Sequence, residues 1–406
     1  MKLDNESILQ RAFDIDLRVE GERISVNVGG QNIEIGSHGL MILGVFDTPK
    51  TLAHGLKELQ ATVCGTRDWI RLTQQIVGLA SAGSLRQPHD QIVPFHSDPG
   101  RFSSPNVHIR MLNDLARTKA YQTALFKLVG SDDIVLDIGT GTGILAATAA
   151  LAGARHVYAV ERSPSMAKLA KLFFANNGFS ERITILEGDS TRLELPERAD
   201  VLVSEIIGND PLVEGILDCY NDARQRLLKP NARVIPRVLR IFALPLSAPK
   251  NYRERLMFTK SSTEKWGKLY GLDFDSYAED SARRDFHCLI NSFVMRDWPR
   301  IAQPLLVADI DLQSGRSVPA GGLHEFVALQ SGTIDAIAVL FDTELAENTG
   351  LSTLPDETTR DNSWANLVWL LGAPLKVQKG DPLVLDYQLG ARNESLVKVR
   401  SMVSSG

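Results

Sequence analysis

Cysteine is scarce in this sequence. The 406 residues include only three, Cys64, Cys219 and Cys288, which lie far apart and form no CxxC pair. An odd number of widely spaced cysteines argues against a disulfide framework and against a zinc site. The pattern is typical of reduced thiols, so we expect a cytoplasmic protein that binds no metal.

Long apolar runs and a surplus of basic residues are also missing. The longest mostly apolar run, ILAATAALAGA, is too short to span a bilayer, and the opening MKLDNESILQ lacks the apolar stretch of a signal peptide. Lysine and arginine number 44 against 49 aspartates and glutamates, which gives a net charge of −5. Nucleic-acid binding usually shows as a basic surplus. We therefore expect neither a membrane nor a nucleic acid as partner.

A chain of this length predicts two or three domains, and the residue pattern divides it into three parts. In the first, residues 1–90, the stretch 13–36 alternates as strands do, Thr48-Pro49 favours a helix start, and residues 66–83 have helical periodicity. This strand-strand-strand-helix-helix order resembles the winged-helix, PqqD-like peptide-recognition domains. The resemblance implies a small α+β domain that could grip a peptide.

The second part, residues 91–235, follows a polar, proline-rich segment at 87–105 that we interpret as a linker or a substrate cap. Helical stretches then separate four strand-like runs: IVLDIG, HVYAVE, ITILEG and DVLVSE. This alternation predicts a parallel, doubly wound α/β sheet. The third part, residues 236–406, has strand-like runs broken by turns, which predict a mainly antiparallel barrel or sandwich with a helical insert at about 250–304.

The first of the four strands leads into a glycine-rich loop. Gly139, Gly141 and Gly143 precede a helix of small residues, and glycine is needed where a chain turns tightly beside a ligand. Glu161 ends the next strand, 18 residues after Gly143, where a carboxylate can bind both hydroxyls of a ribose. NAD-binding folds share these features. Here, however, the final glycine of the dinucleotide pattern is missing, and Asp137 stands two residues before the loop.

This combination resembles the class I S-adenosylmethionine (SAM)-dependent methyltransferases. The resemblance implies a Rossmann-like sheet that binds SAM and releases S-adenosyl-L-homocysteine after transfer. The cofactor contacts that it implies are Asp137, Gly139, Thr140, Gly141, Gly143 and Glu161. The segment EGDS falls where that family holds the adenine, with Asp189 or Ser190 as candidates.

Residues 108–125, HIRMLNDLARTKAYQTAL, are predicted to form one helix upstream of the first strand. Their spacing of histidine, Met-Leu, aspartate, arginine and tyrosine resembles the entrance helix of protein arginine methyltransferases, and the MLND form resembles the divergent members of that family. The resemblance implies that Arg117 pairs with the SAM carboxylate and that His108 forms a polar lid. It also implies that Met111 lines the methyl-transfer site.

The segment VSEIIGNDPLVEG places Glu205 and Glu214 nine residues apart in an apolar setting. It resembles the double-glutamate loop of the same family, which implies that the two carboxylates clamp one guanidinium. Arginine stays protonated, so its nitrogens are poor nucleophiles, and a carboxylate fork fits its planar group. Holding the charge to one side leaves the target nitrogen freer to attack a methyl group. The Asn/Asp-Pro-Pro-aromatic motif of amine, amide and adenine methyltransferases is absent.

Two later segments extend the resemblance. Residues 265–277, KWGKLYGLDFDSY, resemble the segment that leads into the family's dimerisation arm, which implies a homodimer. The run NSWANLVWLL occupies the place of the family's Thr-His-Trp loop, but Ser363 stands where histidine is usual and Asn362 where threonine is, while Trp364 matches. That histidine normally pairs with the acid matched here by Asp114. Its absence leaves proton handling and the usual protein-substrate pocket open.

The sequence therefore predicts a SAM-dependent arginine N-methyltransferase whose catalytic residues are Glu205, Glu214, Met111 and Asp114, with Ser363 and Trp364 in the substrate pocket. The methyl acceptor is a terminal guanidino nitrogen of free L-arginine or of an arginine in a peptide or protein. The alternative is a catalytically silent SAM- or peptide-binding scaffold, against which the intact glutamates and glycine loop argue. Mono- and dimethylation are not distinguished, because they depend on pocket volume.

Overall fold

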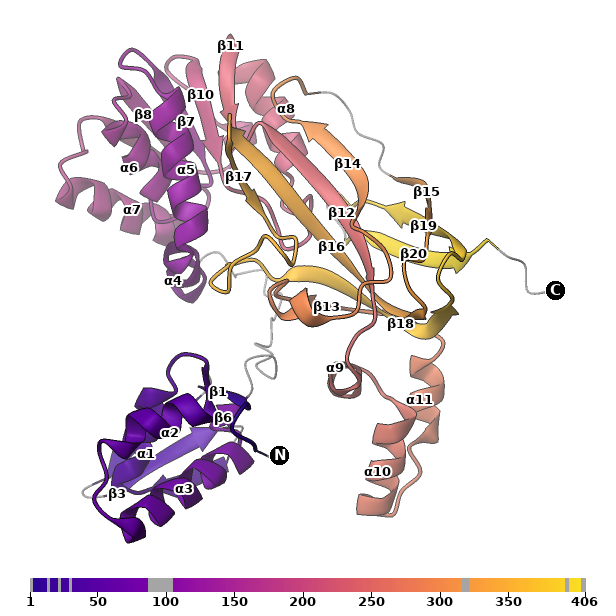
Figure 1. Ribbon diagram of the computed structural model, residues 1–406. Coiled ribbons are helices and arrows are strands. Elements are labelled where there is room, and N and C mark those ends of the chain that lie inside the picture. Colours follow the sequence, from indigo (N-terminus) through magenta and orange to yellow (C-terminus); the bar gives the residue numbers. More distant parts are fainter. Residues whose placement is uncertain are drawn as a thin grey trace. The chain divides into compact units, whose positions relative to one another are not determined.

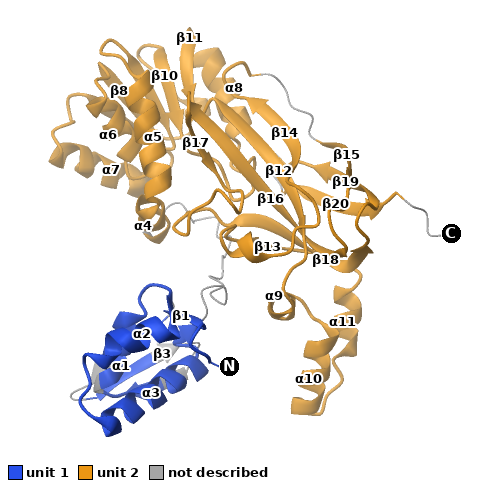
Figure 2. Ribbon diagram, in the orientation of Figure 1, with its two compact units in different colours: residues 1–94 blue, residues 95–406 orange. Residues whose placement is uncertain are grey.

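The computed structural model describes residues 3–12, 15–20, 23–28, 31–86, 105–315, 321–390 and 394–402. The chain divides into two compact units, residues 1–94 and 95–406 (Figure 2). The predicted linker or substrate cap falls almost entirely on residues 87–104, which lie outside the described residues.

The first unit combines a small antiparallel sheet with three helices. The sheet consists of β2 (Ile15–Glu20), β3 (Arg23–Val28) and β4 (Gln31–Ile35), and the helices are α1 (Ser37–Val45), α2 (Leu52–Gln60) and α3 (Thr66–Ser81). A second sheet joins β1 (Ile8–Arg11) to β5 (Lys50–Thr51) and β6 (Leu85–Arg86). The hydrophobic core of the first unit contains Leu9, Ile42, Phe46, Leu72 and Ile76. The winged-helix resemblance of this unit stays a prediction.

The predicted helix start at Thr48-Pro49 is wrong. Residues 50 and 51 form β5 and pair with β1, so α2 begins only at Leu52. The Thr51 hydroxyl accepts the backbone N–H of His54 at 3.2 Å and so caps the helix. Pairing with a strand outside the local pattern thus moved the start by several residues.

The second unit opens with five parallel strands flanked by helices. The strands are β7 (Ile134–Ile138), β8 (His156–Glu161), β9 (Ile183–Glu187), β10 (Ala199–Ser204) and β11 (Leu228–Ile235), in the spatial order β11-β10-β7-β8-β9. The helices are α4 (Pro105–Asn113), α5 (Leu115–Leu128), α6 (Ile144–Leu151), α7 (Pro164–Asn176) and α8 (Ile216–Arg226). All four predicted strands are confirmed, as is the parallel sheet.

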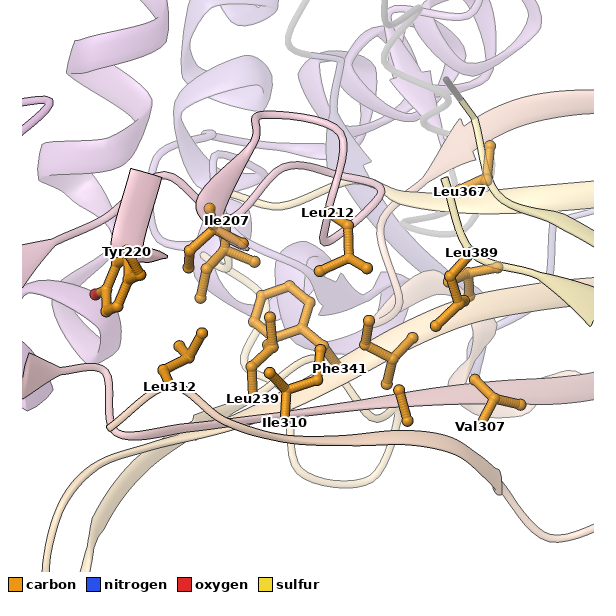
Figure 3. Close-up of a cluster of buried hydrophobic side chains, with 14 of the residues drawn as sticks. Ile207, Leu212, Tyr220, Leu239, Val307, Ile310, Leu312, Phe341, Leu367 and Leu389 are labelled. Carbon is orange, nitrogen blue, oxygen red and sulfur yellow. The ribbon is translucent and has the colours of Figure 1, made fainter. Parts of the chain in front are cut away.

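Antiparallel strands follow and form the predicted barrel-like part. One sheet contains β12 (Val238–Leu246), β13 (Phe286–Ile290), β14 (Leu305–Asp311), β16 (Gly332–Ala346), β17 (Thr349–Ser352) and β18 (Asn366–Val377). The other contains β15 (Gly321–Val327), β19 (Pro382–Gln388) and β20 (Leu396–Ser401). Buried side chains of both sheets pack in one cluster with side chains that follow β10, such as Ile207 and Leu212 (Figure 3).

The insert after β12, predicted at about 250–304 with mixed helical character, is helical in its first half, but it also contains the strand β13, which the sequence pattern missed. It contains α9 (Lys250–Leu256), α10 (Lys260–Tyr270) and α11 (Asp275–Ser281), and the short helix η4 (Val294–Asp297) comes after β13. Figure 1 shows α10 and α11 extending beyond the antiparallel sheets. No helix among the described residues is long and apolar enough to cross a membrane.

Candidate active site

The glycine loop lies at the carboxyl end of β7. Gly139, Gly141 and Gly143 have φ angles of +78°, +54° and +90°, a backbone region that side chains with a Cβ rarely adopt. A Cβ on Gly141 would come within 3.0 Å of the His108 ring, and one on Gly139 would come within 2.9 Å of Ile206. The loop is therefore a close backbone turn, with the His108 imidazole directly beside it.

Two buried carboxylates, Asp137 and Glu161, form hydrogen bonds to this loop. Glu161, at the end of β8, accepts the backbone N–H groups of Gly141 at 2.8 Å and Ser163 at 2.7 Å. Asp137 accepts the hydroxyl of Thr140, while its other oxygen has no partner among the described residues. Burial raises the pKa of Asp137 to about 7. The turn and an acid at the end of the next strand together fit a ligand with hydroxyl groups such as the ribose of SAM.

The predicted adenine contacts lie after β9. Asp189 caps the short helix η3 (Ser190–Arg192), and its carboxylate accepts the hydroxyl of Thr191 at 2.8 Å and the backbone N–H of Thr191 at 3.0 Å, which lowers its pKa. Ser190 is buried, with its hydroxyl 3.7 Å from the sulfur of Cys219. Burial raises the pKa of the Cys219 thiol to about 11, so this cysteine stays neutral.

The predicted single helix over residues 108–125 is wrong, because the chain forms α4 and α5 with a break at Asp114. One oxygen of the Asp114 carboxylate accepts the backbone N–H of Arg117 at 3.0 Å, which caps α5. The other oxygen accepts the backbone N–H of Ser363 at 2.8 Å. Asp114 thus both starts α5 and ties it to the segment before β18.

A buried ion pair joins α5 to the end of β10. Arg117 donates through Nε to Glu205 Oε2 at 3.0 Å, and its Nη2 contacts the same oxygen. Arg117 also donates to the backbone carbonyl of Met111 at 3.3 Å, and its guanidinium carbon lies 5.7 Å from the centre of the Trp364 ring. Sequence reasoning missed the pair, because it matched these two residues to different ligands.

The loop after Glu205 folds back on itself at Gly208. A Cβ on Gly208 would lie 2.6 Å from the carbonyl oxygen of Asp210 and 3.2 Å from Glu214 Oε1. The other Glu205 oxygen accepts the backbone N–H of Ile207 at 3.3 Å. The Glu214 carboxylate therefore lies over the turn that starts beside Glu205, so the structure brings the two ends of the predicted double-glutamate loop back towards each other.

The segment with Ser363 and Trp364 borders this loop. The Trp364 indole donates to the carbonyl of Ile207 at 2.8 Å and meets the Phe341 ring edge-on at 5.2 Å. Ser363 contacts its neighbours through the main chain: its N–H donates to Asp114, and its carbonyl accepts the guanidinium of Arg110 at 2.8 Å. Trp364 is buried and supports the loop, and its place in the substrate pocket stays a prediction.

Sequence reasoning missed three polar residues here: Arg110, Asn209 and Asp210. Asn209 and Asp210 are buried between the two glutamates, in an otherwise apolar loop. That polarity inside an apolar stretch was the signal that the sequence offered. Asn209 accepts the backbone N–H of Ala365 at 2.9 Å, and its side-chain nitrogen has no partner among the described residues.

Comparisons with known proteins agree with this geometry. A family model described as ribosomal protein L11 methyltransferase (PrmA) matches residues 117–235. The chain is 31% identical over 288 residues to protein arginine N-methyltransferase 1.1 of Arabidopsis thaliana, which covers 70% of each chain. It is 29% identical over 291 residues to an arginine N(omega)-methyltransferase of Streptomyces achromogenes subsp. streptozoticus, covering 70% of this chain and 76% of that one. It also resembles the Trypanosoma brucei PRMT1 enzyme-prozyme heterotetrameric complex with AdoHcy, with a TM-score of 0.62 and 25% identity over 74% of this chain and 94% of that one.

Proposed function

The chain belongs to the protein arginine N-methyltransferase family, and from this premise we propose that it methylates a terminal guanidino nitrogen of free L-arginine or of an arginine in a peptide or protein. It is a SAM-dependent transferase. The observation that carries the proposal is the turn at Gly208, which brings the Glu214 carboxylate back over the residues next to Glu205.

Residues of the parallel sheet hold the cofactor in this proposal. When bound, SAM supplies an electrophilic methyl group on its sulfonium. The glycine loop would lie against the ligand, Glu161 would accept the ribose hydroxyls, and Asp189 or Ser190 would contact the adenine. Arg117, held on Glu205, would face the SAM carboxylate, and His108, beside Gly141, would cover it.

Glu205 and Glu214 bind the substrate guanidinium. Each carboxylate accepts N–H groups from the guanidinium, and together they hold its positive charge to one side. The remaining nitrogen keeps more lone-pair character and is oriented towards the methyl group, with Met111 as a wall of the site. Positioning of this kind supplies much of the rate.

In this proposal Asp114 orients the site through hydrogen bonds to the main chain, in place of a hydrogen bond to a histidine side chain. Both of its oxygens accept backbone N–H groups, from Arg117 and from Ser363. We assign acceptance of the proton that leaves the methylated guanidinium to the glutamates or to water.

The proposal also covers the oligomeric state, through the arm, and the role of the first unit. The homodimer forms through the arm of α10 and α11, where Leu269 and Tyr270 of α10 and Leu272 of the turn after it are exposed. With a peptide substrate, residues 1–90 would grip a leader or target sequence. With free L-arginine, the same unit would be a structural or lid element.

Mass spectrometry tests the reaction and its substrate class. The purified chain is mixed with SAM and either L-arginine or a library of arginine-containing peptides. Methylated free arginine supports a small-molecule biosynthetic enzyme, and methylation confined to peptides supports recognition by the first unit. If neither is methylated while SAM binds, the proposed reaction is wrong.

The variant Glu205→Gln tests the double-glutamate mechanism. An amide keeps the shape of the side chain but loses the charge that holds a guanidinium. We expect a loss of turnover of about a hundredfold or more, and a smaller loss of SAM affinity, because the amide oxygen can still accept an N–H of Arg117. Methyl transfer measures the first and calorimetry the second. Unchanged turnover would remove this mechanism.

A further inference from the structure

Main-chain and side-chain groups of the β18 segment hold the double-glutamate loop along one side. The Trp364 indole donates to the carbonyl of Ile207 at 2.8 Å. The N–H of Ala365 donates to the Asn209 side chain at 2.9 Å, and the N–H of Leu367 donates to the Asn209 carbonyl at 3.1 Å. These bonds fix residues 207–209, which begin two positions after Glu205.

Asp210 holds the other half of the loop through Ser395, which precedes β20. One Asp210 oxygen accepts the Ser395 N–H at 2.5 Å, and the other accepts the Ser395 hydroxyl at 2.9 Å. The N–H of Gly390 donates to the same hydroxyl at 3.1 Å, so the hydroxyl's own proton is directed to Asp210. Ser395 is fully buried, and its carbonyl accepts the Trp369 indole at 2.8 Å. The anchor of Asp210 is therefore itself fixed.

Asp210 also begins the turn that presents Glu214. Its carbonyl accepts the N–H of Val213 at 3.1 Å. A displacement of Asp210 would therefore move Glu214, three residues beyond the proline that follows Asp210. The side chains of Ile207 and Leu212 point into the cluster around Phe341 (Figure 3). Apolar contacts are not directional, so they do not fix the exact position of the loop.

This anchor is costly to keep. Burial, with a smaller contribution from Glu394 next to Ser395, raises the pKa of Asp210 to about 6, although the hydrogen bonds from Ser395 act to lower it. Glu394 in turn pairs with His287 of β13 at 2.9 Å. Burying a carboxylate is unfavourable, and apolar replacements of buried charges are often more stable. Stability alone therefore gives little reason for an aspartate at this position.

We propose that Asp210 is a positioning residue: its two hydrogen bonds to Ser395 hold the turn that carries Glu214 where it can grip a guanidinium, without touching the substrate. The inference rests on the proposed function of the double-glutamate loop. Because the role depends on hydrogen bonds and not on charge, asparagine can fill it. Its amide oxygen accepts the Ser395 N–H, and its amide nitrogen donates to the Ser395 hydroxyl, whose own proton must then turn away from position 210.

The test compares Asp210→Ala, Asp210→Asn and Asp342→Ala in the full chain. Asp342, on β16, is a partly buried carboxylate whose pKa is raised by burial; it pairs with Arg240 at 3.0 Å and bonds to no loop residue among those described, so it serves as the matched control. Three quantities are measured: kcat/KM for the arginine substrate, affinity for S-adenosyl-L-homocysteine by calorimetry, and hydrogen exchange of the amides in residues 206–213.

We expect Asp210→Ala to lower kcat/KM about a hundredfold, since small misplacements of reacting groups cost this much. The affinity for S-adenosyl-L-homocysteine should stay within about threefold of wild type, and the amides of residues 206–213 should exchange faster. Asp210→Asn should keep kcat/KM within about threefold and protect the loop as wild type does. Asp342→Ala should lower thermal stability without changing kcat/KM.

Three results would overturn the proposal: wild-type kcat/KM in Asp210→Ala, equal losses in the Ala and Asn variants, or an equal loss in the Asp342→Ala control. If Asp210→Ala does not fold, Ser395→Ala removes only the hydroxyl bond and should lower kcat/KM about tenfold; no change there would also overturn it. A wild-type chain that methylates no guanidine would remove the proposed function. Loop exchange needs no turnover and would still decide whether Asp210 holds the loop.

Discussion

At position 363 a serine stands where the family resemblance leads one to expect a histidine, yet Asp114 keeps a partner. Its Oδ2 atom accepts the backbone N–H of Ser363 at 2.8 Å, and any residue except proline would supply that donor. The sequence predicted that Asp114 faces this segment. It could not predict the substitute, because comparison of side chains does not show where the main chain runs.

Asp137 and Asp210 are both buried carboxylates of raised pKa, and neither shift could be predicted from the sequence. Asp137 stood out only through its place before the glycine loop. Its burial follows from a strand in which every residue is buried, and its one bond to Thr140 leaves an oxygen unpartnered among the described residues. Desolvation of this kind depends on the tertiary structure.

The Asp137→Asn variant tests that burial through the pH dependence of stability. The folded pKa of about 7 exceeds the ordinary value of 3.8, so the folded state binds a proton more tightly than the unfolded state. This group's contribution is most favourable below pH 3.8 and is lost as pH rises to about 7. Asparagine carries no such charge. We therefore expect the difference in Tm, variant minus wild type, to rise between about pH 5 and pH 7 and then stay level.

Asp200→Asn is the control for that series. Although burial acts to raise its pKa, hydrogen bonds from the Ile134 N–H and from Lys229 leave the pKa of Asp200 below 3.8. Its charge is therefore constant at neutral pH, and the corresponding Tm difference should be flat over the same range. A flat difference for Asp137→Asn would show that this carboxylate is not desolvated in solution.

At the scale of whole elements, the parallel strands were predictable and the helix boundaries were not. Strands buried on both faces read as continuous apolar runs, as IVLDIG and DVLVSE do. The break at Asp114 falls inside a regular helical pattern. An aspartate can stand within a helix or cap the start of a new one, and the sequence does not show whether its side chain accepts a backbone N–H. The Arg117–Glu205 pair spans 88 residues of sequence, a separation for which spacing rules give no distance.

The turn at Gly208 supplies a prediction at this scale. A Cβ there would meet the Asp210 carbonyl at 2.6 Å and the Val213 side chain at 2.7 Å, so alanine must displace the loop. We expect Gly208→Ala to lower kcat/KM at least about tenfold while affinity for S-adenosyl-L-homocysteine is unchanged, because the glycine loop is a separate turn. Methyl-transfer kinetics and calorimetry measure the two quantities.

Gly78→Ala is the matched control for this turn. Gly78 lies within α3, and a Cβ there would meet nothing within 4 Å. Replacing it should stabilise the first unit by about 0.5–1 kcal/mol and leave turnover unchanged. Equal kinetics in Gly208→Ala and wild type would show that the loop tolerates displacement, contrary to the proposed clamp.

For the whole molecule, changes of pattern along the sequence predicted where one architecture gives way to another. The parallel sheet ends with β11 at Ile235, and the antiparallel strands begin with β12 at Val238. The sequence could not show that the two parts of the second unit share one buried cluster, which joins Leu136 of β7 to Leu239 of β12 and Leu385 of β19. Such a cluster depends on contacts between residues far apart in sequence.

The arm carries the last prediction, which concerns assembly. In α10 and the turn after it, Leu269 is 62% exposed and Leu272 64% exposed, while the nearby rings of Trp266, Phe274 and Tyr277 pack against one another in edge-on pairs. Exposed apolar side chains grouped on a projecting element are typical of an interface. If the arm joins two copies, Leu269→Glu with Leu272→Glu should convert a dimer to a monomer, as measured by light scattering after size-exclusion chromatography.

Leu323→Glu, on β15 and 63% exposed, is the matched control and should leave the dimer intact. A dimer that survives the arm substitutions would place the subunit contact elsewhere, and a wild-type monomer would remove the homodimer from the proposal.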